Sequence, residues 1–170
     1  MTERFKLNAV LDECRLHAEV LNEALAEIDN ILFDEESITH LSTMQRRLLD
    51  QIAYRYAKLQ DTIGEKLLPG ILDLIQEPLP EKATFIEKLW RLERLGVIES
   101  ANLWKELREL RNQIAHEYHD QPKIKVAVIN RFLHGAHQII GLWQQIQAYV
   151  NSQPYLYSDA PIYHQQGKPT

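Results

Sequence analysis

The chain has 170 residues, of which 45% are hydrophobic and 25% charged, and its formal net charge at pH 7 is -5. This length suits one domain with a buried core and is short for two, and the composition is that of an ordinary globular protein. The negative charge argues against a protein that binds nucleic acid over its whole surface, although it leaves room for a local basic cleft.

The sequence also indicates the cellular compartment in which the protein is expected. Residues 1–6 lack a basic region followed by an apolar run, so no signal peptide is expected. No apolar run approaches the roughly 20 residues of a membrane span, so we expect no membrane association. A single cysteine, Cys14, excludes an intramolecular disulfide, and the reducing cytoplasm is therefore the expected location.

Apolar residues recur at alternating spacings of four and three through the first part of the chain, which is typical of one face of a long helix. The series is Leu7, Leu11, Cys14, Ala18, Leu21, Leu25, Ile28 and Leu32. Cys14 is expected to be a small core residue. His17 lies beside the series, where we expect it to meet solvent or make a surface hydrogen bond. Residues 34–37 interrupt the pattern and offer capping groups for the next helix.

A second long helix is predicted over residues 41–63, with a polar face that carries several cations. These cations are Arg46, Arg47, Arg55 and Lys58. Two interpretations stay open for them, a solvated face and a face that meets RNA. Pro69 and Gly70 are expected to end or kink this helix, because proline lacks the amide donor and clashes with the preceding turn. Residues 71–75 should continue as a short helical piece.

A third amphipathic helix is predicted over residues 81–95, with Phe85, Leu89 and Leu92 facing inward. Gly96 is expected to follow its C-terminus. Ser100 is expected to cap the N-terminus of a fourth helix.

A last helix is predicted to start at residues 120–122. Its inward positions are Phe132, Ala136, Ile139, Trp143, Ile146 and Val150. Residues 151–170 lose this periodicity and gain Pro, Gln, Ser and Tyr, so we expect a flexible C-terminal tail. The sequence therefore predicts an all-α fold, an antiparallel up-and-down bundle of four to five helices over residues 1–150.

The fourth helix carries the densest set of chemically capable side chains, between residues 108 and 120. Projected at about 100° per residue, its apolar arc faces a core. That arc comprises Leu103, Leu107, Leu110 and Ile114, and the opposite arc carries Lys105, Arg108, Asn112, His116 and His119. Asn112 and His116 are four residues apart and share a face, where the amide can fix the imidazole tautomer.

Arg111 and His116 are five residues apart, which separates them by roughly 140° around the helix axis. One helix does not easily aim both side chains at one atom. If they act together, the simplest geometry is a pair of such helices that face each other across a two-fold axis.

These residues resemble the signature of a known family. Arg111 followed by Asn112, then His116 and Tyr118, resembles the motif of the HEPN superfamily, and specifically of its HepT-like toxins, which pair with a minimal nucleotidyltransferase. Phe85, Leu89 and Leu92, then residues 95–98 and residues 104–118, are similar to the family's third helix, glycine turn and motif helix. The remainder of the chain matches only as a helical bundle of suitable size.

The resemblance implies a toxin that is a metal-independent RNA endonuclease, works as a homodimer with the site between two protomers, and needs no cofactor. In such chemistry His116 is the general acid/base, because the imidazole pKa lies near neutrality. Arg111 clamps the phosphate oxygens, and Asn112 orients the ring or the substrate. Lys105 and Arg108 are candidate RNA-phosphate contacts.

The resemblance also implies regulation by a partner. In the HepT-like family the tyrosine of the motif, here Tyr118, receives AMP from the nucleotidyltransferase antitoxin, and this modification silences the toxin. Phosphate added close to Arg111 would neutralise the clamp, which is consistent with silencing. The alternative for Tyr118 is a ring packed in the core with its hydroxyl hydrogen-bonded.

Other interpretations remain open for the whole motif. Arg111 could pair with a carboxylate such as Glu65 or Glu117, and His116 could merely end a helix, where the dipole favours a cation. An alternative from a different class is a non-catalytic HEPN protein that serves as the substrate-binding or docking partner of a nucleotidyltransferase.

Metal binding is not expected from the histidines. His116, His119 and Asp120 have the wrong spacing for the helical zinc pair, which needs positions i and i+4. His134 and His137 on the last helix are expected to be exposed rather than metal-binding.

Overall fold

The computed structural model describes residues 3–29, 31–75, 79–114, 121–153 and 156. Every regular element in these ranges is helical, so the predicted all-α fold is confirmed. The elements are α1 (Glu3–Ile28), α2 (Glu35–Thr39), α3 (Thr43–Thr62), the π-helix η1 (Ile63–Leu67), α4 (Leu68–Leu74), α5 (Phe85–Arg94), α6 (Ala101–Ile114) and α7 (Pro122–Ser152).

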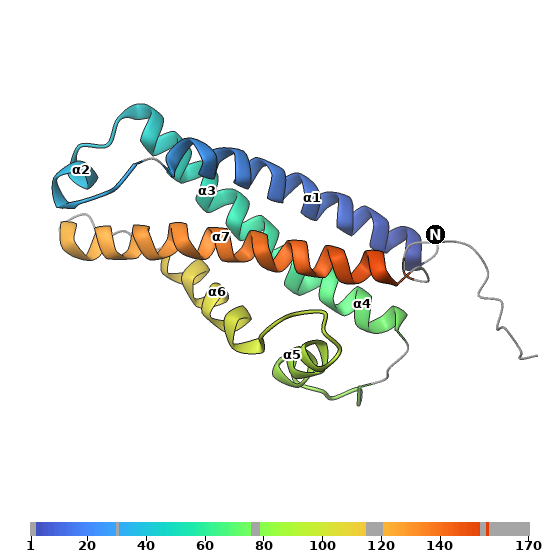
Figure 1. Cartoon of the computed structure of the whole chain (residues 1–170). Coiled ribbons are helices and arrows are strands. Elements are labelled where there is room, and N and C mark those ends of the chain that lie inside the picture. Colours follow the sequence, from blue (N-terminus) through green and yellow to red (C-terminus); the bar gives the residue numbers. More distant parts are fainter. Residues whose placement is uncertain (1–2, 30, 76–78, 115–120, 154–155, 157–170) are drawn as a thin grey trace, which may run out of the picture.

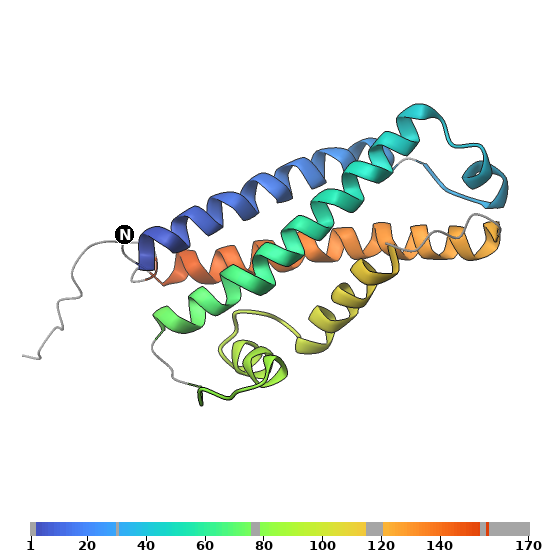
Figure 2. The same cartoon turned by 180° about the vertical axis from the view of Figure 1, so that it is seen from behind.

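The long helices α1, α3 and α7 lie side by side (Figures 1 and 2). Helix α1 runs against α3, and α6 runs against α7, so the order α1, α3, α6, α7 is up and down as predicted (Figure 1). Helix α6 contacts both α3 and α7, and α5 packs on α6. The α3–α6 contact is the one that shapes the candidate site.

The core lies between these helices and uses most of the predicted apolar positions. All six predicted core residues of α7 are buried. Cys14 is fully buried as expected, and burial raises the pKa of its thiol to about 12. The first helix ends earlier than predicted, however, and Leu32 is 94% exposed. Phe33 and Ile38 enter the core in its place because α2 packs on α7.

The N-terminal caps follow the side-chain chemistry of the connecting segments. Asp34 forms a capping box with Ser37, so residues 34–37 do supply capping groups, but for the short helix α2, which was not predicted, and not for the second long helix. Helix α3 has its own capping box, formed by Ser42 and Gln45. Thr84 and Glu87 form a third box, so α5 starts at Phe85 and not at residue 81.

The prediction that Pro69 and Gly70 end the helix is wrong, although the α-helical pattern is interrupted by a π-turn just before Pro69. Helix α3 passes through η1 into α4 (Figure 1), and Pro69 lies in the first turn of α4. The amide of Leu68 donates to the carbonyl of Ile63, five residues back, in the wider π-type turn. A proline in a first helical turn needs no amide donor, so the chain continues.

The turn between α5 and α6 follows the predicted glycine. Gly96 has φ +76°, its amide donates to the carbonyl of Glu93, and the next amide donates to Leu92. These two bonds make a Schellman motif, which favours glycine at the position with positive φ. Ser100 then accepts a hydrogen bond from the amide of Leu103 at 3.2 Å, as predicted for the cap of α6.

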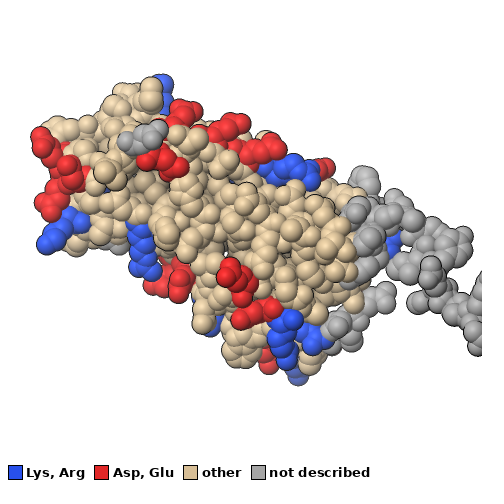
Figure 3. Space-filling view, viewed as in Figure 1, with Lys and Arg blue, Asp and Glu red and all other residues tan. Residues whose placement is uncertain are grey.

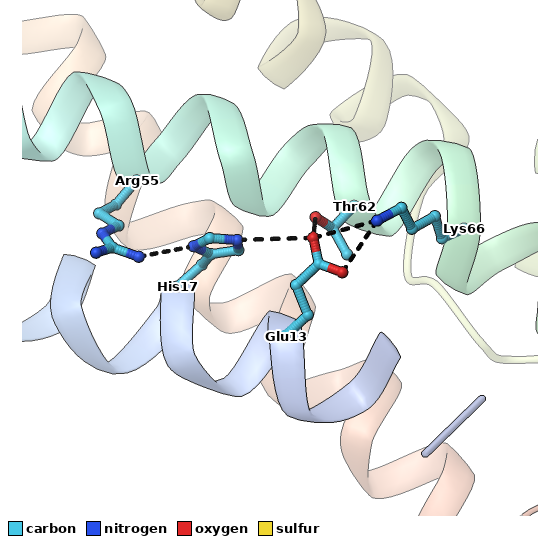
Figure 4. Close-up of polar contacts among 5 residues, drawn as sticks. All are labelled: Glu13, His17, Arg55, Thr62 and Lys66. Carbon is cyan, nitrogen blue, oxygen red and sulfur yellow. Dashed lines mark hydrogen bonds and ion pairs between the residues drawn. The ribbon is translucent and has the colours of Figure 1, made fainter. Parts of the chain in front are cut away.

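A polar cluster joins α1 to α3 and its continuation into η1 (Figure 4). Arg55 donates to Nδ1 of His17 at 3.0 Å, and Glu13 accepts from Thr62 at 3.0 Å and from Lys66 at 3.0 Å. His17 is buried, so the expectation that it meets solvent is wrong. Burial, and then the adjacent charge of Arg55, hold the pKa of His17 below its ordinary value.

Charge is unevenly distributed over the surface. Residues 132–153 of the α7 region contain no Lys, Arg, Asp or Glu, and Figure 3 shows a broad uncharged area over α7. His134 and His137 are exposed, as predicted, and His137 pairs with Asp29 at 2.8 Å. Within the described ranges, no helix has the length and apolarity needed to cross a membrane.

The C-terminal boundary extends slightly beyond residue 150. Helix α7 ends at Ser152, and the side chain of Leu156 is fully buried in the core. Residues 154–155 and 157–170 lie outside the described part of the chain, so the flexible tail stays a prediction.

Candidate functional site

A buried tyrosine joins α3 to α6. The hydroxyl of Tyr56 donates to the carbonyl of Leu107 at 2.6 Å, and burial raises the pKa of this phenol above its ordinary value. Its ring meets that of Phe132 edge to face, with centroids 5.0 Å apart. This seam fixes the spacing of the two helices next to the candidate site.

An open pocket of about 460 Å³ lies where α3 and η1 face α6. One wall comes from α3 and η1 and includes Gln60, Asp61 and Gly64. The other wall comes from α6 and includes Trp104, Arg108, Arg111 and Asn112. Phe85, at the start of α5, completes the lining. The pocket therefore gathers two guanidinium groups, two amides and two aromatic rings.

Arg111 forms an ion pair across this pocket. Its Nη2 lies 3.0 Å from Oδ2 of Asp61, and both side chains are partly exposed. The alternative in which Arg111 pairs with a carboxylate is thus found, with Asp61 in place of Glu65 or Glu117. The Nε atom of Arg111 is buried and has no hydrogen-bond partner among the described residues. The guanidinium is held at one end and keeps an unused donor.

Arg108 lies at the same pocket and contacts an aromatic ring. Its guanidinium carbon is 5.7 Å from the ring centroid of Phe85, within the range of a cation–π interaction. Phe85 is 38% exposed, so its predicted inward orientation is wrong, whereas Leu89 and Leu92 are buried. The ring lines the pocket next to its cation partner on α6.

The structure brings together three of the predicted site residues, Arg108, Arg111 and Asn112. Lys105 is exposed on α6 and does not line the pocket. His116 and Tyr118 lie outside the described residues, so their positions relative to Arg111 stay predictions.

Two residues of the pocket were missed by the sequence interpretation. Gln60 is 3% exposed, and neither its amide nitrogen nor its amide oxygen has a hydrogen-bond partner among the described residues. Trp104 is 2% exposed, and its indole nitrogen is also unpartnered there. Each such group typically costs about 1–3 kcal/mol. Unpaired buried polar groups of this kind call for a functional or structural explanation.

The π-helix η1 adjoins the same wall of the pocket. Single π-turns occur frequently at functional sites. The sequence feature that lies in this π-turn is an isolated glycine, Gly64, five residues before Pro69. A lone glycine inside a helical pattern was insufficient to predict the turn, because the residue against which it packs, Trp104, lies 40 positions away in the sequence.

No protein-family model matches the chain, and neither a curated protein nor a solved structure matches it significantly. Among the described residues, no group of three His, Cys, Asp or Glu side chains is placed to hold a metal ion. Evidence about function therefore comes from the residues of the pocket and from the sequence motif that continues from it.

Proposed function

We propose that this chain is a metal-independent RNA endonuclease of the HEPN type, the toxin of a toxin–antitoxin pair. The observation that supports the proposal most directly is the pocket shared by Arg108, Arg111 and Asn112. His116 follows Arg111 by five residues in the sequence. A phosphate clamp, an orienting amide and a general base are the groups that cleavage by the ribose 2′-OH requires.

In the proposed reaction His116 takes the proton from the ribose 2′-OH. The 2′ oxygen bonds to the adjacent phosphorus, and the bond from phosphorus to the 5′ oxygen breaks. A second imidazole, His116 of the partner subunit, returns a proton to that 5′ oxygen. The products are a 2′,3′-cyclic phosphate and a 5′-hydroxyl, and Arg111 stabilises the charge that grows on the non-bridging oxygens.

A surface on α3 has features that support the RNA-binding part of this proposal. Tyr54 is 55% exposed, and the cationic groups of Arg55 and Lys58 lie 5.5 and 5.7 Å from its ring centroid. Exposed aromatic rings combined with cations are the usual means of binding single strands, because every base has a flat face. Arg46 and Arg47 are exposed on the same helix, and these features favour the interpretation of this face as RNA-facing.

The proposal includes a partner nucleotidyltransferase and regulation at Tyr118. The phenol oxygen of Tyr118 would attack the α-phosphorus of ATP bound to the partner, and pyrophosphate would leave. The phosphate of the resulting AMP group would compete with RNA phosphate for Arg111.

A second candidate function, the non-catalytic docking protein, is favoured by one contact. Asp61 already neutralises Arg111, as a structural ion pair would. The two functions differ in their dependence on the imidazole, because a docking protein tolerates His116→Ala and a nuclease does not.

The test is expression of the chain alone in bacteria, followed by RNA cleavage with the purified protein in EDTA. We expect growth arrest and cleavage from the wild type, and neither from His116→Ala or Arg111→Ala. His134→Ala, which changes an exposed histidine of α7, is the matched control and should keep both activities. Arrest by His116→Ala at the wild-type level would exclude the nuclease.

A further inference from the structure

The inner wall of the pocket contains polar groups that the proposed cleavage chemistry does not use. The amide of Gln60 and the indole nitrogen of Trp104 both belong to pocket-lining residues, and both lack partners among the described residues. An isosteric leucine would fill the volume of Gln60 without an unpaired amide. The retention of an unpaired polar side chain next to a pocket is therefore a sign of a ligand.

The backbone of η1 makes room for this arrangement. Gly64 has no side chain, and the indole of Trp104 occupies the space that a Cβ would need, at 2.8 Å. Trp104 and Gln60 thus line the same pocket as Arg111 and the Arg108–Phe85 pair.

The unpaired atoms define the kind of ligand that fits. Gln60 offers an amide donor next to an amide acceptor, while the indole nitrogen of Trp104 and Nε of Arg111 offer donors only. Residues that line the pocket therefore carry one unpaired acceptor and three unpaired donors, all of them buried. Asp61 and Glu65 add acceptors at the mouth, but Asp61 is engaged by Arg111 and Glu65 is exposed to water.

A pyrimidine base has the complementary edge. Uracil presents an N–H donor between two carbonyl acceptors, and cytosine presents an amino donor beside two acceptors. Each edge uses one protein acceptor and two protein donors, which the Gln60 amide and one further N–H supply. Guanine presents two donors beside one acceptor and needs the opposite set, and adenine uses only the amide pair.

We propose that the pocket is a base-recognition subsite that binds a pyrimidine of single-stranded RNA, with Gln60 reading the base edge. The proposal rests on the proposed endonuclease function and specifies its substrate. Phe85 and Arg108 at the mouth supply the flat face on which a base stacks. Because Arg111 lines the same pocket, the bound base belongs to the nucleotide whose 3′-phosphate is cut.

The first experiment measures binding without cleavage. The four nucleoside 3′-monophosphates are titrated into the wild type, Gln60→Leu and Gln60→Glu by calorimetry. We expect uridine and cytidine 3′-monophosphates to bind about tenfold more tightly than the purine compounds, and Gln60→Leu to abolish that preference. Gln60→Glu replaces the donor with an acceptor and should shift the preference toward guanosine 3′-monophosphate. Gln51→Leu, at an exposed glutamine of α3, is the matched control and should behave as the wild type.

The second experiment sequences the ends of cleaved RNA. We expect a pyrimidine on the 5′ side of the cut for the wild type and for Gln51→Leu, and no base preference among the cuts that Gln60→Leu makes. A wild type that binds the pyrimidine nucleotides selectively but cuts no RNA supports the subsite and contradicts the nuclease. Equal binding of all four nucleotides, no detectable binding, or the same preference in Gln60→Leu would overturn the subsite. A Gln60→Leu protein that is more stable than the wild type but has the same nucleotide binding and the same cleavage pattern would also overturn the subsite.

Discussion

A Cβ atom added to Gly64 would lie 2.8 Å from Cζ2 of Trp104. The indole therefore packs directly on the η1 backbone and leaves no space there for a side chain, and both residues line the pocket. Helix α3 and its π-turn hold α6 through this contact and through the Tyr56 hydrogen bond.

Gly64→Ala should lower the free energy of unfolding by about 1–3 kcal/mol, because the rigid indole must shift to admit the methyl group. Urea unfolding monitored by circular dichroism measures the change. Gly141→Ala is the matched control, since an added Cβ there meets nothing within 4 Å. It should stabilise α7 by up to about 1 kcal/mol, as removal of a mid-helix glycine does. Equal stability of Gly64→Ala and the wild type would contradict the close contact.

Asp61→Asn should strengthen RNA binding. The substitution keeps a hydrogen-bond acceptor for Arg111 but removes the negative charge that competes with phosphate. Since both side chains are partly exposed, we expect a decrease in Kd of only about two- to fivefold. Fluorescence anisotropy with labelled single-stranded RNA measures it, in a His116→Ala background that prevents cleavage. Asp50→Asn, an exposed position on α3, is the control. Weaker binding by Asp61→Asn would show that the carboxylate mainly positions the guanidinium.

His17 should make folding stability depend on pH. Arg55 donates to its Nδ1, so this nitrogen must be an unprotonated acceptor, and protonation would place two positive charges in contact (Figure 4). Its pKa in the folded state lies below the ordinary histidine value of about 6.5, so below about pH 6.5 the unfolded state binds more protons. The free energy of unfolding should therefore fall as the pH drops through this range.

Urea unfolding between pH 8 and pH 5 measures that decrease. His17→Gln should remove part of it, while His134→Gln, at an exposed site, should leave it unchanged. The carboxylate of Glu13, whose pKa is lowered mainly by its hydrogen bond with Lys66, contributes only at lower pH. Parallel curves for the wild type and His17→Gln would show that His17 is not the titrating group.

The periodic positions of the sequence predicted the fold because burial of one helix face imposes its own spacing on the chain. The apolar series of α1 and α7 became core, and Gly96 and Ser100 took the terminal positions that their conformational and hydrogen-bonding preferences favour. The preferences of the residues themselves and of their near neighbours in the sequence were sufficient to predict these features.

Features that depend on distant partners were not predictable in the same way. Asp61 meets Arg111 across 50 positions, and Arg55 meets His17 across 38. A π-turn precedes Pro69 in place of the expected end of the helix, and Gly64 in this turn packs on Trp104, which lies 40 positions away in the sequence. Gln60 lies next to the apolar stripe residue Leu59, and nothing local distinguishes it from a solvated glutamine.

The central claim is that the protein cleaves RNA through attack of the ribose 2′-OH, without a metal ion. Its most direct test is the removal of a single 2′ oxygen from the RNA. An oligonucleotide that the wild type cuts is compared with one carrying a single 2′-deoxynucleotide on the 5′ side of the cut, in EDTA. We predict that the all-ribose strand yields a 2′,3′-cyclic phosphate and that the deoxy-substituted strand is not cut at that position. Cleavage of both strands at the same position and rate, or failure of the wild type to cut any single-stranded RNA, would contradict the proposed function.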